Sequence, residues 1–145
     1  MTIDWQIISQ LLIAAFLGAV VGLERELAKK EAGIKTCSLV SLGAALFVII
    51  PQISSIFISS NAFDPSRVLS QIIVGVGFIG AGVIMFQKTY ISGVTTAASL
   101  WVVAGVGAAV GFKLYDVAIA ATIISLIILV IIGKAERKFI GDRDE

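Results

Sequence analysis

Three hydroxyl side chains, Thr95, Thr96 and Ser99, stand close together in a long apolar stretch, with Thr95 and Ser99 one helical turn apart. Arg67 and Gln71 show the same spacing in the preceding apolar stretch. In an apolar setting, such groups bond across helices or bind a small polar ligand. We therefore expect the segment from Arg67 to Trp101 to hold a small polar site, in which the Trp101 indole N–H needs a buried acceptor.

A second set of charged residues stands at the edge of the first apolar stretch. Glu24, Arg25 and Glu26 follow Gly22 directly, and Lys35 and Thr36 close the same charged loop. The loop can be read as a solvated anchor. It can equally be read as part of a site, because carboxylates at a membrane edge are rare without a role.

Asp64 and Pro65 form a helix start, with Asp64 at the N-cap and proline in the first turn. Arg67 follows in that first turn, where it can extend to the membrane interface or belong to the polar site. Capping is the preferred role for Asp64.

The residue types argue against an enzyme. The sequence has no histidine, and no pair of carboxylates at helical spacing falls inside an apolar stretch. We expect no resident metal and no cofactor, although Mg²⁺ is the natural ion for a transport function because it prefers oxygen ligands. The side chains that could supply them are Glu24, Glu26, Asp64, Thr95, Thr96 and Ser99.

Composition predicts the elements that position these residues. Of the 145 residues, 58% are hydrophobic and 14% charged, whereas soluble domains are about 45–50% apolar and about 25% charged. The sequence therefore predicts an all-α, polytopic membrane protein with one domain, residues 1–133, and a short tail, residues 134–145. Its expected transmembrane helices cover residues 5–23, 37–58, 68–86, 93–112 and 116–133.

The distribution of lysine and arginine predicts the orientation. The first loop, the third loop and the C-terminal tail hold nine of the eleven, and only Arg67 and Lys113 fall on the other side. The positive-inside rule then places the N-terminus outside and the C-terminus in the cytoplasm.

Glycines at helical spacing predict close packing between helices. The expected packing residues are Gly18, Gly22, Gly75, Gly77, Gly80, Gly82, Gly107 and Gly111. The GxGxxG spacing that begins at Gly75 is no dinucleotide fingerprint, because it follows no strand and opens no βαβ unit. A broken helix that exposes carbonyls to an ion is the alternative to close packing here.

Three segments together resemble the MgtC/SapB family of bacterial membrane proteins: GLERE with AGIKT and SLVSLGAALF (22–26 and 32–47), DPSRVLSQIIVGVGFIGAGVI (64–84) and GVTTAASLWVVAGVGAAVG (93–111). The resemblance implies a five-helix protein of the bacterial inner (plasma) membrane, in a short form without the soluble C-terminal domain of many relatives. It links the chain to magnesium homeostasis or stress adaptation. The residues that match motif positions of the family are the four glycines from Gly75 to Gly82 and Glu24, Arg25, Glu26, Lys35, Thr36, Asp64, Arg67, Gln71, Thr95, Thr96, Ser99 and Trp101.

Two functions follow as hypotheses. In the first, small-residue faces bind another membrane protein or a second copy of the chain, and we expect a homodimer and no nucleic acid. In the second, the protein transports Mg²⁺ or another ion through a polar site between the third and fourth helices.

Overall fold

The computed structural model describes residues 4–53, 64–86 and 91–135. Within these ranges, five helices are long and apolar enough to cross a membrane, which confirms the predicted all-α membrane fold. The helices are α1 (Trp5–Leu27), α2 (Ile34–Ile53), α4 (Pro65–Val83), α5 (Val94–Gly111) and α6 (Tyr115–Ile127), the last extended by a π-helical turn, η1 (Ile128–Ile132). Two short strands, β1 (Met85–Phe86) and β2 (Ile91–Ser92), pair antiparallel between α4 and α5.

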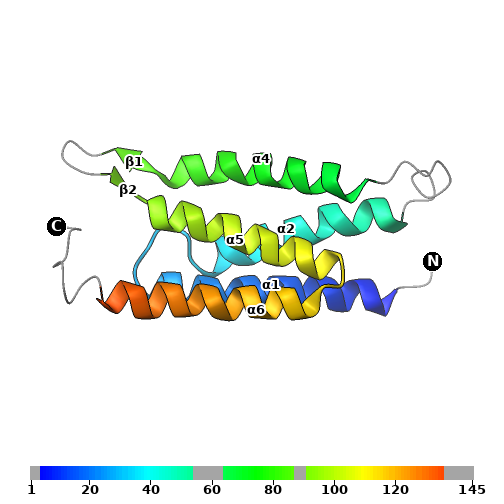
Figure 1. Cartoon of the computed structure of the whole chain (residues 1–145), viewed down its shortest axis with the longest axis horizontal. Helices are drawn as coiled ribbons and strands as arrows, with labels where there is room; N and C mark the ends of the chain where they lie inside the picture. The colour runs from blue at the N-terminus through cyan, green and yellow to red at the C-terminus, as the bar shows by residue number, and fades with distance from the viewer. Residues whose placement is uncertain (1–3, 54–63, 87–90, 136–145) are drawn as a thin grey trace.

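Helix α5 is the centre of the bundle (Figure 1). It packs on α1, α2, α4 and α6, and ten of its residues are buried. Helices α1 and α2 also pack closely on one another, while α4 rests mainly on α5 and touches α2 much less. The fold is therefore a tight core of α1, α2 and α5, with α6 and α4 on opposite sides of it.

Glycines bring the three core helices into backbone contact. A Cβ atom at Gly18 would lie 2.6 Å from the Cys37 carbonyl oxygen, and one at Gly111 would lie 2.7 Å from Val48 Cβ. A Cβ at Gly22 would lie 2.7 Å from Ile34 Cα, and one at Gly107 would overlap the Ser41 carbonyl oxygen. At these four positions the predicted close packing is present.

The glycines of α4 behave differently. Only Gly80 faces a neighbour, Ala97 of α5, at 3.5 Å from an added Cβ. No atom of the described residues lies within 4 Å of a Cβ placed at Gly75, Gly77 or Gly82. The prediction that these three pack against the next helix of the same chain is therefore wrong, because α4 meets α5 along a narrow line through Gly80.

The helix ends also differ in part from expectation. Helix α1 continues past the expected end of the first span at residue 23 and ends at Leu27, and Lys29 adopts a left-handed conformation with φ of 55°. Pro51 lies inside α2, which continues to Ile53. The expected end of that span at residue 58 and most of the tail, residues 134–145, lie outside the described residues.

Gly93 joins the short hairpin to α5 with φ of +84°, and a Cβ there would overlap the Val83 carbonyl oxygen. We expect Gly93→Ala to lower the melting temperature clearly, because the left-handed conformation alone costs about 1–2 kcal/mol for other residues. The matched change Gly82→Ala, at an open helical position, should leave stability unchanged or raise it slightly. Equal melting temperatures for the two variants in detergent would contradict this placement of Gly93.

Candidate functional site

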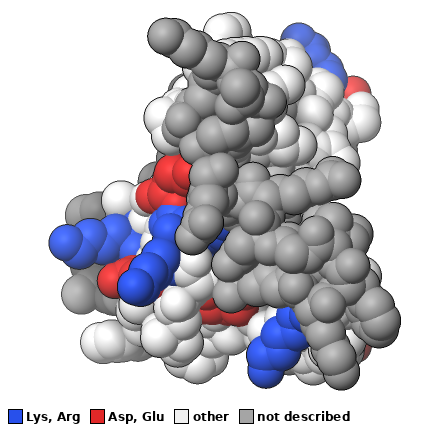
Figure 2. Space-filling model, turned by 90° about the vertical axis from the view of Figure 1, so that its left-hand side faces the viewer, with Lys and Arg blue, Asp and Glu red and all other residues white. Residues whose placement is uncertain are grey.

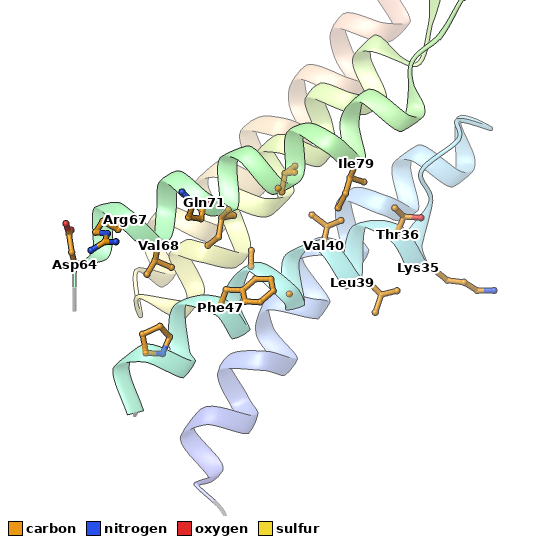
Figure 3. Close-up of a pocket in the computed structure, with 16 residues that line it drawn as sticks. Lys35, Thr36, Leu39, Val40, Phe47, Asp64, Arg67, Val68, Gln71 and Ile79 are labelled. Carbon is orange, nitrogen blue, oxygen red and sulfur yellow. The ribbon is translucent and has the colours of Figure 1, made fainter. Parts of the chain in front are cut away.

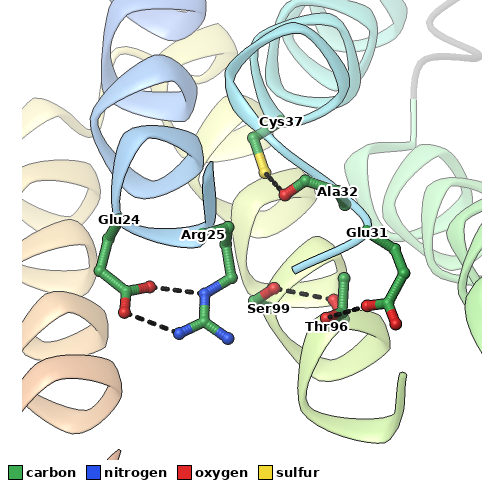
Figure 4. A network of polar contacts seen from close by, with 7 residues as sticks. All are labelled: Glu24, Arg25, Glu31, Ala32, Cys37, Thr96 and Ser99. Atoms are coloured by element: carbon green, nitrogen blue, oxygen red, sulfur yellow. Dashed lines mark hydrogen bonds and ion pairs between the residues drawn. The ribbon is translucent and has the colours of Figure 1, made fainter. Parts of the chain in front are cut away.

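The polar side chains that link different elements lie at the two ends of the bundle, whereas the buried Ser41 and Thr122 lie along α2 and α6 between those ends. One end carries the α1–α2 loop, the hairpin and the end of α6. The other carries the starts of α1, α4 and α6 and the ends of α2 and α5. The polar contacts at the loop end are drawn in Figure 4.

Arg25 is the buried cation of the loop end. Its residue is 4% exposed, although it lies only two residues from the end of α1. Its Nε donates to Glu24 Oε2 at 2.5 Å and its Nη2 to Glu24 Oε1 at 2.8 Å, which forms a two-pronged ion pair. The pair satisfies both charges at the membrane edge, so Glu24 and Arg25 act together rather than as separate ligands.

The hydroxyls of α5 form the second contact at this end. Thr96 is buried and donates from Oγ1 to Glu31 Oε2 at 3.2 Å, and Ser99 donates back to the Thr96 carbonyl oxygen at 2.7 Å. Figure 4 shows Glu31 reaching from the α1–α2 loop toward the start of α5, with Cys37 and its contact to the Ala32 carbonyl oxygen nearby. The Glu31 carboxylate therefore links the α1–α2 loop to α5.

Arg67 and Gln71 do not join these hydroxyls. Helices α4 and α5 run antiparallel, and Gly80 meets Ala97 near the start of α5. Arg67 is thirteen residues before Gly80, which is about 20 Å along a helix. The predicted site that combines Arg67 and Gln71 with Thr95, Thr96 and Ser99 is therefore absent, because the two groups belong to opposite ends of the bundle.

Two further expectations about α5 fail. Trp101 is 54% exposed and faces away from the core, so its indole needs no buried acceptor. Thr95 is also exposed, whereas Thr96 beside it is buried. The core face of α5 passes through Thr96, Ser99 and Leu100 instead, and Trp101 lies on the outer face.

The remaining loop residues have separate roles. Glu26 Oε2 accepts a hydrogen bond from the Ile34 backbone N–H at 3.0 Å and so caps the start of α2. Lys35 is exposed and Thr36 is half-buried at the start of α2. This end carries charges of both signs, which Figure 2 shows gathered on the face that looks out from it.

Asp64 caps α4 as predicted. Its Oδ1 accepts from the Ser66 backbone N–H at 2.9 Å and from the Ser66 hydroxyl at 2.7 Å. These hydrogen bonds hold the pKa of the Asp64 carboxyl below its usual value. The Asp64 carboxylate therefore serves as the N-cap of α4.

This cap predicts a pH dependence. Because the pKa is lower in the folded state, the stabilisation is present above the ordinary pKa of about 4 and is lost as the pH falls through the folded value. We expect the melting temperature of the wild-type protein to fall more steeply below about pH 4 than that of Asp64→Asn. Asp116→Asn, at the exposed start of α6 on the same end, controls for loss of a carboxylate. Parallel pH profiles for Asp64→Asn and wild type would contradict the cap.

Sequence reasoning missed three residues with interhelical roles. Gln10 is buried in α1 and donates to the Val110 carbonyl oxygen at 3.2 Å, and Gln52 of α2 donates to the Gly111 carbonyl oxygen at 3.2 Å. Gln52 thereby satisfies the Gly111 carbonyl at the end of α5, while the Val110 carbonyl also accepts from the Lys113 backbone N–H at 2.9 Å. Glu31 of the charged loop accepts a hydrogen bond from Thr96 of α5. An amide inside an apolar stretch was the available signal for Gln10.

A groove of about 1040 Å³ lies between α2 and α4. We call it the α2–α4 groove; it is lined by Leu39, Gly43 and Phe47 of α2 and by Arg67, Gln71 and Gly75 of α4, among others. Figure 3 shows Asp64 and Arg67 at one mouth and Lys35 and Thr36 at the other.

The fold and these contacts define a multi-pass membrane protein whose buried polar groups link helix ends. The sequence matches the MgtC family over residues 11–138, and the chain belongs to this family.

Relatives support the assignment. The chain is 37% identical over 127 residues to a protein of Escherichia coli K12 named "Putative magnesium transporter YhiD", covering 86% of this chain and 59% of that one. It is 40% identical over 131 residues to Protein MgtC of Salmonella typhimurium LT2, covering 90% and 54%. An uncharacterized protein of Haemophilus influenzae is 42% identical over 126 residues, covering 83% and 53%. The chain thus spans little more than half the length of these relatives, and no solved structure matches it.

Proposed function

We propose that this protein serves magnesium homeostasis or stress adaptation in the bacterial inner membrane, and that it acts through helix contacts with a membrane partner or a second copy of itself. Membership of the MgtC family and the name of the relative YhiD support the link to magnesium. The cytoplasmic C-terminus expected from the positive-inside rule belongs to the same proposal.

The open face of α4 carries the proposal. Gly77 and Gly82 have no described atom within 4 Å of an added Cβ, and only Val76 and Gly80 of this helix are buried. Glycine inside a helix costs roughly 0.5–1 kcal/mol relative to alanine. At Gly18, Gly22, Gly107 and Gly111 that cost is offset by close contact with another helix, and the open glycines of α4 are suited to the same contact with a helix from outside the chain.

The test is co-purification of two differently tagged copies, and of any partner, from bacterial membranes. We expect Gly77→Leu to abolish the complexes while the protein stays folded, since its Cβ meets nothing within the chain. Gly105→Leu, at an open position on α5, is the matched control and should leave the complexes intact. Complexes that persist in Gly77→Leu, or are lost equally in both variants, would count against a specific α4 surface.

Transport of an ion is the second candidate, favoured by the contact between Glu31 and Thr96. Both supply oxygens at the loop end, and Mg²⁺ as a transported substrate takes oxygen ligands. Among the described residues, however, Glu24 is committed to Arg25, and no three acidic or cysteine residues gather as a metal site would require. Magnesium flux into liposomes that is absent from empty vesicles and reduced by Thr96→Val would support transport instead.

A further inference from the structure

The α2–α4 groove is open toward the lipid side of the bundle. Helices α2 and α4 both pack on α5, but they touch one another little, so a gap of about 1040 Å³ remains between them. Its walls are largely apolar and include Leu39, Phe47 and Ile79. At the depth of the bilayer core such a groove is covered by apolar groups, because water there would lack hydrogen-bond partners.

One mouth of the groove carries side-chain donors that make no hydrogen bond within residues 4–53, 64–86 and 91–135. Arg67 is exposed, and among the described residues its side chain makes no hydrogen bond or ion pair, although the nearby Asp64 carboxylate attracts it electrostatically. Gln71 is exposed one turn further along the same wall. Asp64 is the carboxylate at this mouth, but Ser66 already occupies its Oδ1.

Figure 3 shows Arg67 and Gln71 on the α4 side of the groove, with the apolar side chains of both helices beyond them. A guanidinium and an amide one turn apart match the oxygens of a phosphodiester. Gly43 and Gly75 line the groove, and neither has a described atom within 4 Å of an added Cβ. Residues without side chains therefore line the part of the groove where an acyl chain would run below the headgroup.

We propose that the α2–α4 groove binds one glycerophospholipid, with its phosphodiester at Arg67 and Gln71 and an acyl chain lying along Gly43 and Gly75. This site is separate from Gly77, which lies on the opposite side of α4 from Gly75, and it does not depend on the function proposed above.

The groove differs from the surfaces at which helices of this chain meet. There, glycines such as Gly18 and Gly107 press directly on the backbone of α2. In the groove, the large side chains of Leu39, Phe47 and Ile79 are exposed and line the walls together with the glycines. A thin, flexible acyl chain fits between such side chains, whereas a second helix needs a smooth surface of small residues.

The experiment is native mass spectrometry of the purified chain released from nanodiscs that contain phosphatidylglycerol and phosphatidylethanolamine. Wild type should retain one phospholipid. Arg67→Gln should bind it about tenfold more weakly, as expected for loss of a charged hydrogen bond. Lys113→Gln, an exposed cation at the same end outside the groove, is the matched control and should retain the lipid.

A second pair of variants separates lipid from protein as the occupant. Gly75→Leu fills the groove and should displace the lipid without changing the oligomeric state, while Gly82→Leu, outside the groove, should retain the lipid. If Arg67→Gln and Lys113→Gln lost bound phospholipid equally, the lipid would be held only by general attraction to positive charge, and the proposal would be overturned. A Gly75→Leu protein that keeps its lipid would also overturn the proposal. So would loss of self-association in Gly75→Leu, since a second copy of the chain would then fill the groove.

Discussion

Replacing Gly107 by leucine is expected to prevent the bundle from closing. The new side chain would begin at a Cβ that overlaps the Ser41 carbonyl oxygen, and this oxygen belongs to the backbone of α2. Overpacking of a core typically costs about 1–3 kcal/mol, and the cost should exceed that range here because a whole helix must move. We expect little folded protein in fluorescence-detected size-exclusion chromatography, and a much lower melting temperature for the fraction that remains.

Gly105 provides the matched control on the same helix. It is exposed, and no described atom lies within 4 Å of an added Cβ, so Gly105→Leu should fold with a melting temperature near that of wild type. If the two variants were equally stable, α5 could not contact α2 through Gly107. If both failed to fold, a general intolerance of α5 to leucine would explain the result instead.

Replacing Arg25 by leucine is expected to have the second large effect. The change leaves the Glu24 carboxylate at a half-buried position without the cation that binds both its oxygens. Removing one partner from a buried ion pair costs about 3–5 kcal/mol, because the other charge stays out of water without compensation. The measurement is thermal unfolding of purified protein in a mild detergent.

Replacing both members of the Glu24–Arg25 ion pair by apolar residues should cost much less stability than replacing Arg25 alone. In the double variant Glu24→Met with Arg25→Met, no unpaired charge is left, and we expect most of the stability to return. Lys134→Leu, at an exposed position on the same end of the bundle, controls for the loss of one positive charge. A double variant as unstable as Arg25→Leu alone would show that the guanidinium acts through packing rather than through Glu24.

The sequence allowed the five helices to be predicted because each is a long apolar stretch between charged or turn-forming residues. Glycine spacing also identified four contacts correctly, at Gly18, Gly22, Gly107 and Gly111. In these cases a local pattern corresponds directly to a local structure. The cap at Asp64 belongs to the same class, since its partner, Ser66, is two residues away.

The site could not be predicted in the same way. Whether Arg67 meets Thr95 depends on the direction of α4 relative to α5 and on where along their lengths they touch, and neither is encoded in a local pattern. Trp101 faces outward because α5 turns Thr96, Ser99 and Leu100 toward the core, a rotation that the nearly uniform apolar surface of this helix does not reveal. The contact of Glu31 with Thr96 joins residues that are 65 apart in the sequence.

Both proposals depend on the position of α4, which lies antiparallel along α5 through Gly80 and leaves Gly77 and the α2–α4 groove open. Oxidative crosslinking of paired cysteines, in a chain with Cys37 replaced by alanine, measures this position directly. The Cβ atoms of residues 80 and 97 would lie 3.5 Å apart, within the range of about 3.5–4.5 Å found in disulfides. We predict that Gly80→Cys with Ala97→Cys forms a disulfide within one chain and that Arg67→Cys with Thr95→Cys does not; a crosslink in the second pair and none in the first would contradict the fold described here.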